Sequence, residues 1–352
     1  MKAMRNVVLV MMFILVSFFA ACSSDSGIGE GNRSGQEEAE QTGTAGDNGN
    51  GNAGNGGDNE NSSEDVSGSG QSAPNAISIA TGGTSGTYYP LGGGMAQIFT
   101  EHVVSATAEA TGASVENMQL LKNSDVDLAL VQSDIADYAA NGTQMFAEQG
   151  ALDNIQALAS LYNETIQIVV AASSDIYSVE DLAGKRVSIG APGSGTEANA
   201  QQILEIHGMS EDDLGQVQRL SFGDSTSYIQ DGTLDAAFVT AGTPTSAVSE
   251  LAATVGVRIV HIEDDKIAAL IEKYPYYAEQ TVDGGTYTGF EDTVKTVAVK
   301  AQLVVRADLD QQTVYSLTKS MFENLDQLAA VHQKATEITL EQALDGVSLE
   351  VH

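Results

Sequence analysis

Two glycine-rich loops carry the residues of this chain whose types and spacing suit ligand binding. The first loop spans residues 81–90 and the second spans residues 190–197, and each holds glycines interleaved with hydroxyl side chains. Each loop follows a short apolar run and precedes a segment with helical spacing, so each should present free backbone N–H groups at a helix N-terminus. Such groups, together with the helix dipole, favour an anion or a carboxylate.

Neither loop has the pattern of a nucleotide-binding motif. No lysine follows the glycines as it does in phosphate-binding loops, and the G-x-G-x-x-G spacing of dinucleotide sites is absent. The loops therefore predict a site that uses backbone dipoles and hydroxyl groups rather than a basic side chain.

Two further polar segments follow predicted strands. They are Gln132 with Ser133, and Thr240 with Thr243. In open α/β sheets ligands bind at the carboxyl ends of the strands, where all four segments are expected to lie. The predicted ligand-binding residues are Gly83, Thr84, Ser85, Gly86, Thr87, Tyr88, Tyr89, Gln132, Ser133, Ser194, Gly195, Thr196, Thr240 and Thr243.

Catalytic patterns are weak. The five histidines show no H-x-x-x-H or H-E-x-x-H spacing, and there is no G-x-S-x-G elbow. We interpret the acidic clusters at residues 211–213 and 264–265 as solvated turns. The sequence thus predicts a binding protein without catalytic residues, metal ligands or a cofactor.

Strands and helices alternate from residue 76 onward, which favours an α/β fold with mostly parallel sheets. The length of 352 residues fits about two domains. We predict strands at 77–80, 127–132, 166–172, 186–189, 236–240, 258–262 and 296–305, and helices at 90–105, 144–152, 196–207 and, as a pair, 311–332.

The beginning of the sequence has the features of a secretory signal. Lys2 and Arg5 precede an almost wholly apolar run at residues 7–19, which is too short for an ordinary membrane-spanning helix. The small residues before Cys22 complete a segment, Phe-Ala-Ala-Cys, that resembles the lipobox of bacterial lipoproteins. This resemblance implies a signal peptide at 1–21, a lipidated Cys22 and an anchor on the outer face of the cytoplasmic membrane.

Residues 22–75 are rich in Gly, Ser, Asn and Glu, and we expect a disordered acidic linker there. The whole chain has 48 acidic and 15 basic residues, a formal net charge of −33. Such a charge repels nucleic acid and anionic lipid, so we expect no nucleic-acid partner and membrane contact through the anchor alone. Cys22 is the single cysteine, which excludes an intramolecular disulfide.

Several segments together resemble one family of receptors. Residues 81–90 resemble the glycine-rich opening of the TAXI family, the solute receptors of TRAP transporters. The resemblance continues through residues 128–134, 182–196, 285–289 and 297–299, and covers about residues 76–335. This chain has Thr288 where the family commonly has proline.

The resemblance implies a type II periplasmic-binding-protein fold, with two α/β lobes that close over a cleft. Lobe I would comprise residues 76–168 plus 303–352, and lobe II residues 169–302. It also implies a monomer that captures a small organic anion or amino acid, of the glutamate/glutamine or dicarboxylate class. The solute would then pass to a TRAP-type permease in the membrane.

Three other functions remain open on the sequence alone. The same cleft could serve a sensory receptor with a signalling partner, and the linker at residues 22–75 could serve as the stalk of a surface adhesin. A hydrolase that uses a loop hydroxyl would need a general base, which no sequence motif supplies.

Overall fold

The computed structural model describes residues 74–352, which belong to one compact unit of the chain. The predicted signal peptide, the lipidation of Cys22 and nearly all of the predicted linker lie outside the described residues. Within residues 74–352, none of the helices combines the length and the apolar character that crossing a membrane requires.

The unit is built as two lobes, each with three short parallel strands. In the first lobe the strand order is β2-β1-β3, with β1 (Ile77–Ala80), β2 (Ala106–Glu109) and β3 (Leu128–Gln132). In the second lobe it is β7-β5-β6, with β5 (Arg186–Ser188), β6 (Gln216–Gln218) and β7 (Ala236–Ala241). The strands β1, β3, β5 and β7 are mostly buried because helices cover both faces of each sheet, whereas the edge strands β2 and β6 are partly exposed.

Two long antiparallel strands join the lobes. They are β4 (Ile155–Ala171), with 17 residues, and β10 (Val294–Arg306), with 13 residues. In the first lobe β10 pairs with β3, and in the second lobe β4 pairs with β7 and with β8 (Val257–Val260). The strand β9 (Ala278–Val282) pairs with the start of β10, so both lobes share one ten-stranded sheet within the described residues.

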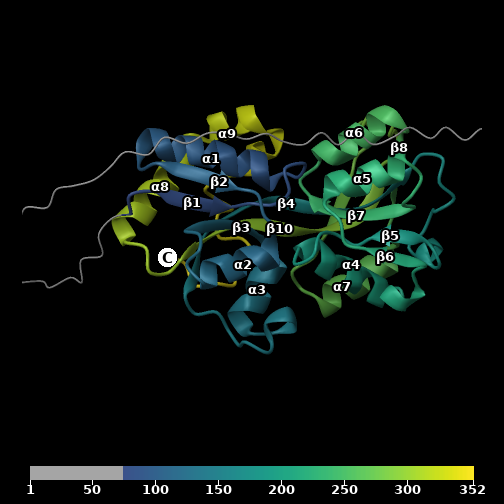
Figure 1. The fold of residues 1–352 in the computed structure, drawn as a ribbon, viewed down its shortest axis with the longest axis horizontal. Coiled ribbons are helices and arrows are strands. Elements are labelled where there is room, and N and C mark those ends of the chain that lie inside the picture. The colour runs from purple at the N-terminus through teal and green to yellow at the C-terminus, as the bar shows by residue number, and fades with distance from the viewer. Residues whose placement is uncertain (1–73) are drawn as a thin grey trace, which may run out of the picture. The chain divides into compact units, whose positions relative to one another are not determined.

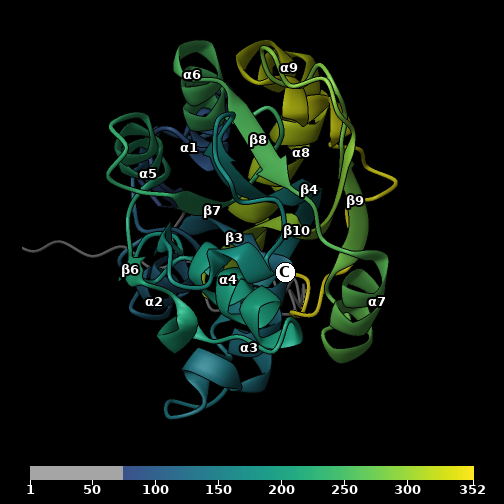
Figure 2. The ribbon, with the colours of Figure 1, turned by 90° about the vertical axis from the view of Figure 1, so that its right-hand side faces the viewer.

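Helices cover both faces of this sheet (Figures 1 and 2). In the first lobe one face carries α1 (Tyr88–His102), α8 (Gln311–Glu323) and α9 (Leu325–Val331), and the other carries α2 (Ser114–Lys122) and α3 (Ser133–Asn141). In the second lobe one face carries α5 (Phe222–Gln230) and α6 (Ser246–Thr254), and the other carries α4 (Gly195–Ile206) and α7 (Asp264–Lys273).

Each lobe therefore has two apolar cores, one on each face of the sheet. Along β4 the side chains of Ile166 and Ile168 enter the core under α4 and α7, whereas Val169 enters the core under α5 and α6. This alternation follows from the two-residue period of a strand. It explains why residues 168–171 form a continuous apolar run.

The prediction of a two-lobe α/β fold is confirmed, but the sheet is mixed. The strands β2-β1-β3 and β7-β5-β6 are parallel within each lobe, whereas β4 and β10 run antiparallel to all their neighbours, including β8 and β9. The predicted lobe boundaries at residues 168 and 302 fall inside β4 and β10 and stay predictions.

Two predicted elements differ from the structure. The helix predicted at 144–152 is wrong: residues Gln144–Phe146 form a single 3₁₀ turn, and Gly150 adopts a φ of 77° that ends any helix there. The strand predicted at 166–172 begins eleven residues earlier, at Ile155. Polar Asn163 and Glu164 interrupt the apolar pattern of this strand, so the pattern predicted only the part that follows them.

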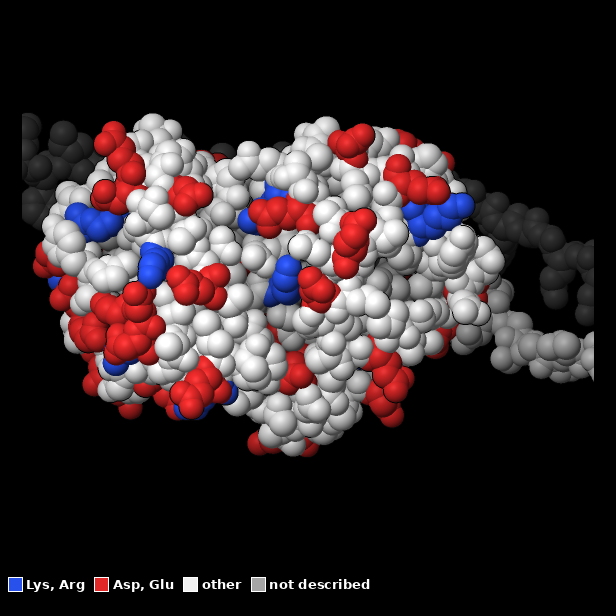
Figure 3. Space-filling view, turned by 180° about the vertical axis from the view of Figure 1, so that it is seen from behind, with Lys and Arg blue, Asp and Glu red and all other residues white. Residues whose placement is uncertain are grey.

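Acidic groups are spread over both lobes on the face shown in Figure 3, with basic groups beside several of them. Lys295 lies 2.7 Å from Asp264, and Lys185 lies 2.8 Å from Asp175. These pairs are solvent-exposed and each contributes little stability, so the acidic surface acts mainly through net charge.

Two adjacent glycines in α1 should respond oppositely to alanine. A Cβ at Gly92 would overlap Thr81 Cγ2, whereas a Cβ at Gly93 meets nothing within 4 Å among the described residues. We expect Gly93→Ala to stabilise the protein by about 0.5–1 kcal/mol, because glycine is a poor helix former. Gly92→Ala should destabilise it by about 1–3 kcal/mol through overpacking. Urea unfolding of both variants tests the packing of α1 on β1; equal effects would contradict it.

Candidate functional site

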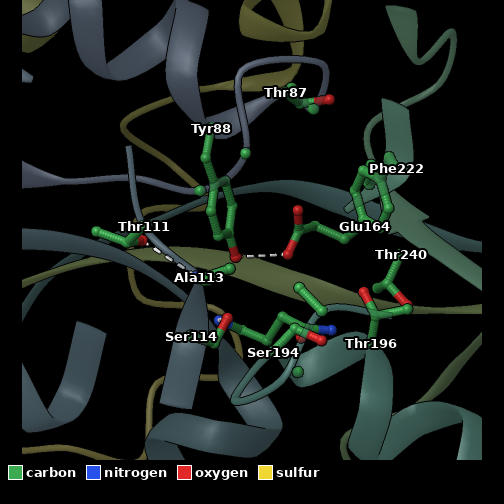
Figure 4. Close-up of a pocket in the computed structure, with 18 of the residues that line it drawn as sticks. Thr87, Tyr88, Thr111, Ala113, Ser114, Glu164, Ser194, Thr196, Phe222 and Thr240 are labelled. Atoms are coloured by element: carbon green, nitrogen blue, oxygen red, sulfur yellow. Dashed lines mark hydrogen bonds between the residues drawn. The ribbon is translucent and has the colours of Figure 1, made fainter. Parts of the chain in front are cut away.

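A cavity of about 70 Å³ lies between the lobes, at the carboxyl ends of their parallel strands. This volume is several times the roughly 10–15 Å³ that one water molecule needs, so the cavity suits a small ligand. Figure 4 shows side chains from both lobes pointing into it. Nine of the predicted residues line it, namely Gly83, Gly86, Thr87, Tyr88, Gln132, Ser194, Gly195, Thr196 and Thr240.

Four helices begin at the cavity. The first residues of α1, α2, α4 and α5, which are Tyr88, Ser114, Gly195 and Phe222, all line it. Each helix N-terminus carries about half a positive charge, and the N–H groups of its first turn have no partner within the helix backbone. Among the described residues that line the cavity, none is Lys or Arg. The cavity therefore presents positive potential from backbone dipoles, which suits a carboxylate or another small anion.

Serine side chains fix where the two second-lobe helices start. The Ser194 hydroxyl accepts the Glu197 N–H at 3.2 Å, and the Ser221 hydroxyl accepts the Asp224 N–H at 3.1 Å. Each serine is thus the N-cap of its helix, α4 or α5. Each cap accepts the N–H of the third helical residue, so the N–H groups of the first two residues stay available to a ligand in the cavity.

One ionisable carboxyl group lies in the cavity. Glu164, in the middle of β4, is 2% exposed, and its Oε2 accepts a 2.6 Å hydrogen bond from the Tyr88 hydroxyl (Figure 4). Burial, with a smaller contribution from the nearby Asp134, raises the pKa of Glu164 to about 8 against the opposing effects of Tyr88 and Lys334. The carboxyl is therefore mostly protonated at pH 7 and can donate a hydrogen bond to a bound anion.

A buried polar network joins the lobes beside the cavity. Asn199 of α4 accepts hydrogen bonds from Gln132 at 2.7 Å and from Thr240 at 3.0 Å, and its amide donates to Asp134 at 2.8 Å. Burial raises the pKa of Asp134 to about 7. Because Gln132 and Asp134 belong to the first lobe and Asn199 to the second, this network fixes the lobes relative to each other.

Backbone groups also link the lobes. The Gly193 carbonyl accepts the N–H groups of Val115 and Glu116 at 3.1 and 3.2 Å, in the first turn of α2. The Thr87 hydroxyl donates to the Gly242 carbonyl at 3.3 Å. The structure therefore has the two lobes closed on each other around the cavity.

Five predicted residues do not line the cavity. Thr84 and Tyr89 are exposed, with 38% of Tyr89 accessible. The Ser85 carbonyl accepts the Ala247 N–H, the Ser133 hydroxyl accepts the Lys300 N–H, and Thr243 is partly buried. Ser85 and Ser133 thus serve contacts between chain segments.

The sequence reasoning missed several residues that line the cavity, notably Thr111, Ser114, Glu164, Ser221 and Phe222. Two of them had a detectable signal. Ser221 stands three residues before Asp224, which is a helix-start pattern, and Glu164 is a lone acid in a buried apolar strand. Thr111 and Ser114 follow β2, which is too short and polar to predict.

Solved structures share this architecture. A protein of Bordetella bronchiseptica superposes with a TM-score of 0.51 at 16% identity, over 78% of this chain and 79% of its own. PhnD1 of Prochlorococcus marinus, in complex with methylphosphonate, gives a TM-score of 0.51 at 11% identity, over 76% and 94%. The periplasmic aliphatic sulphonate binding protein SsuA of Escherichia coli gives a TM-score of 0.43 at 16% identity, over 76% of this chain and 80% of its own. At these identities the likeness concerns the fold.

The two-lobe sheet with an interlobe cavity defines a type II periplasmic-binding-protein-like fold. The model of the NMT1-like family matches residues 79–352, and the chain belongs to that family. The narrower resemblance to the TAXI receptors stays a prediction.

The raised pKa of Glu164 makes stability depend on pH. Its folded pKa of about 8 exceeds the unfolded value of 4.5, so the folded state holds the proton more tightly. The stabilisation of the folded state by this proton is complete below pH 4.5 and is lost as the pH rises to about 8. We expect the unfolding free energy of the ligand-free protein to fall over this range relative to Glu164→Gln, on the order of 1.4 kcal/mol per pKa unit.

Chemical unfolding at several pH values measures this difference. Glu109→Gln, at an exposed glutamate, is the matched control and should follow the unmodified protein. If the Glu164→Gln curve also ran parallel to that of the unmodified protein from pH 4.5 to 8, Glu164 would not be protonated in the folded state.

Proposed function

We propose that this protein is an exported solute receptor that captures a small organic anion or amino acid between its lobes and delivers it to a membrane permease. The observation that carries the proposal is the convergence of four helix N-termini on one cavity without a basic side chain. Dipoles of this kind hold an anion less tightly than a buried Arg pair would, which suits reversible capture.

The groups that face the cavity support a ligand with a carboxylate. The carboxylate oxygens would accept hydrogen bonds from N–H groups in the first turns of α4 and α1, and the Glu164 carboxyl would donate one further hydrogen bond. Tyr88 supplies an aromatic wall on one side and Phe222 on the other. The cavity of about 70 Å³ suits a small solute, and the resemblance of the loops to the TAXI family supports the glutamate/glutamine or dicarboxylate class.

Export and anchoring rest on the sequence of residues 1–22. The signal-like segment and the lipobox-like Cys22 support a receptor tethered to the outer face of the cytoplasmic membrane. The family resemblance of the loops supports a TRAP-type permease as the partner. Copurification with such a permease would favour transport, whereas copurification with a signalling protein would favour a sensory receptor.

A ligand panel tests the capture of a small acid. At 100 times its Kd, a ligand stabilises the folded state by about 2.7 kcal/mol. At about 2–4 °C per kcal/mol, this raises the unfolding temperature by several degrees. We expect one amino acid or dicarboxylate to give this shift in protein refolded after removal of bound solute. No shift with any small acid would count against the proposal.

The Thr196 hydroxyl should contact the ligand directly. Thr196 lines the cavity and is 3% exposed, and within residues 74–352 its hydroxyl makes no hydrogen bond that would keep it from a ligand. We expect Thr196→Val to weaken ligand binding by about 1–3 kcal/mol, because the change removes the hydroxyl and preserves the shape. Thr84→Val, at an exposed position of the first loop, should leave affinity unchanged. Titration calorimetry with the ligand found in the panel compares them, and equal affinities would remove Thr196 from the site.

A further inference from the structure

A second cluster of polar side chains lies in the second lobe and includes no residue that lines the cavity. It consists of Glu180 in the 3₁₀ turn Glu180–Leu182, His207 directly after α4, and Glu263 directly before α7. One ligand-type atom from each residue lies within 4.8 Å of the others. Three segments that are far apart in the sequence thus bring an imidazole and two carboxylates together.

His207 has a defined orientation. Its side chain is fully buried, and its Nδ1 lies 2.7 Å from the Ile203 carbonyl. A carbonyl only accepts, so Nδ1 carries the proton, and in the neutral ring the Nε2 lone pair is free. That Nε2 faces Glu263 Oε2, a second acceptor, at 3.4 Å. The Glu263 side chain is 34% exposed, so the pair is partly buried, and two acceptors directed at each other there need a cation between them.

We propose that Glu180, His207 and Glu263 bind a divalent transition-metal ion of the zinc type. An imidazole nitrogen with two carboxylates suits zinc and its neighbours, whereas calcium and magnesium prefer oxygen ligands alone. Ligand atoms about 2.0–2.1 Å from a tetrahedral zinc lie about 3.4 Å apart. The separation of Nε2 from Oε2 matches this value. The bond from Nδ1 to a backbone carbonyl is the usual outer support of a metal-binding histidine.

The surroundings also favour a cation. His207 is the C-cap of α4, where the helix dipole is negative. The exposed His261 lies 3.4 Å from the other oxygen of Glu263 and could supply a fourth ligand. The positive charge of Lys266 lies nearby and opposes a bound cation, since its ammonium group donates to the Ile206 carbonyl at 3.3 Å.

The metal would hold the second lobe together at one end of α4. The opposite end of this helix carries Ser194 and Thr196 of the cavity, so a fixed α4 helps to fix the ligand site. Because none of the three ligands lines the cavity, the metal should stabilise the lobe without taking part in solute binding.

Zinc titration of the purified, metal-stripped protein tests the proposal. We expect zinc to bind at one site and to raise the unfolding temperature, with magnesium and calcium much less effective. His207→Gln and Glu180→Gln should each weaken zinc binding by more than about 100-fold, since even the outer partners of metal ligands contribute 10–100-fold. Glu180 is exposed, so its replacement should leave the fold intact.

Matched controls are His102→Gln and Glu272→Gln, both at exposed positions outside the cluster, and both should bind zinc like the unmodified protein. Cobalt absorption gives an independent readout: nitrogen and oxygen ligation supports the site, whereas a thiolate charge-transfer band would assign the metal to Cys22 and overturn it. Zinc affinity unchanged in both His207→Gln and Glu180→Gln would also overturn it.

Discussion

The antiparallel pairing of β4 with β10 is the constraint on which the rest of the structure depends. These two strands run through both lobes and form the centre of the shared sheet, because β3 pairs with β10 on one side and β7 pairs with β4 on the other. The parallel strands of the two lobes then direct their carboxyl ends, and the helices that follow, toward the same gap. Glu164 stands in that gap because it lies where β4 passes from one lobe to the other.

Charge in this molecule acts at two ranges with opposite sign. At long range the net charge of −33 opposes the approach of an anion, although salt screens exposed charges beyond about 8–10 Å. At short range the helix ends of α1, α2, α4 and α5 supply positive potential in a confined space. A protonated Glu164 removes the remaining negative charge from the cavity. The local dipoles therefore decide which solute stays, and the surface charge affects the rate of arrival.

The sequence predicted the parts of the site that local chemistry defines. Glycine and hydroxyl residues at 81–90 and 190–197 indicated helix starts, and Gly83, Thr87, Ser194 and Thr196 do line the cavity. Thr84 and Tyr89 show the limit, because composition does not tell which side of a turn faces inward. Thr111 and Ser114 could not be predicted, for another reason. Their place in the cavity depends on how distant strands pair, and a single sequence carries little information about such pairing. The cluster of Glu180, His207 and Glu263 has no short spacing and emerges only from the packing of α4 and α7.

Closure of the lobes explains how a site built from dipoles can select its ligand. The first turns of α1 and α2 belong to one lobe and those of α4 and α5 to the other, so a ligand meets all four only when the lobes are closed. A ligand shifts the equilibrium by the difference of its affinities for the open and closed forms. Direct contacts between the lobes, such as Gln132 with Asn199 and Val115 with Gly193, stabilise the closed form by themselves. They therefore lower the free energy of closure that the ligand must supply. A small acid that bridges the helix ends and accepts the Glu164 proton in a hydrogen bond therefore favours closure, whereas a solute that reaches only one lobe does not.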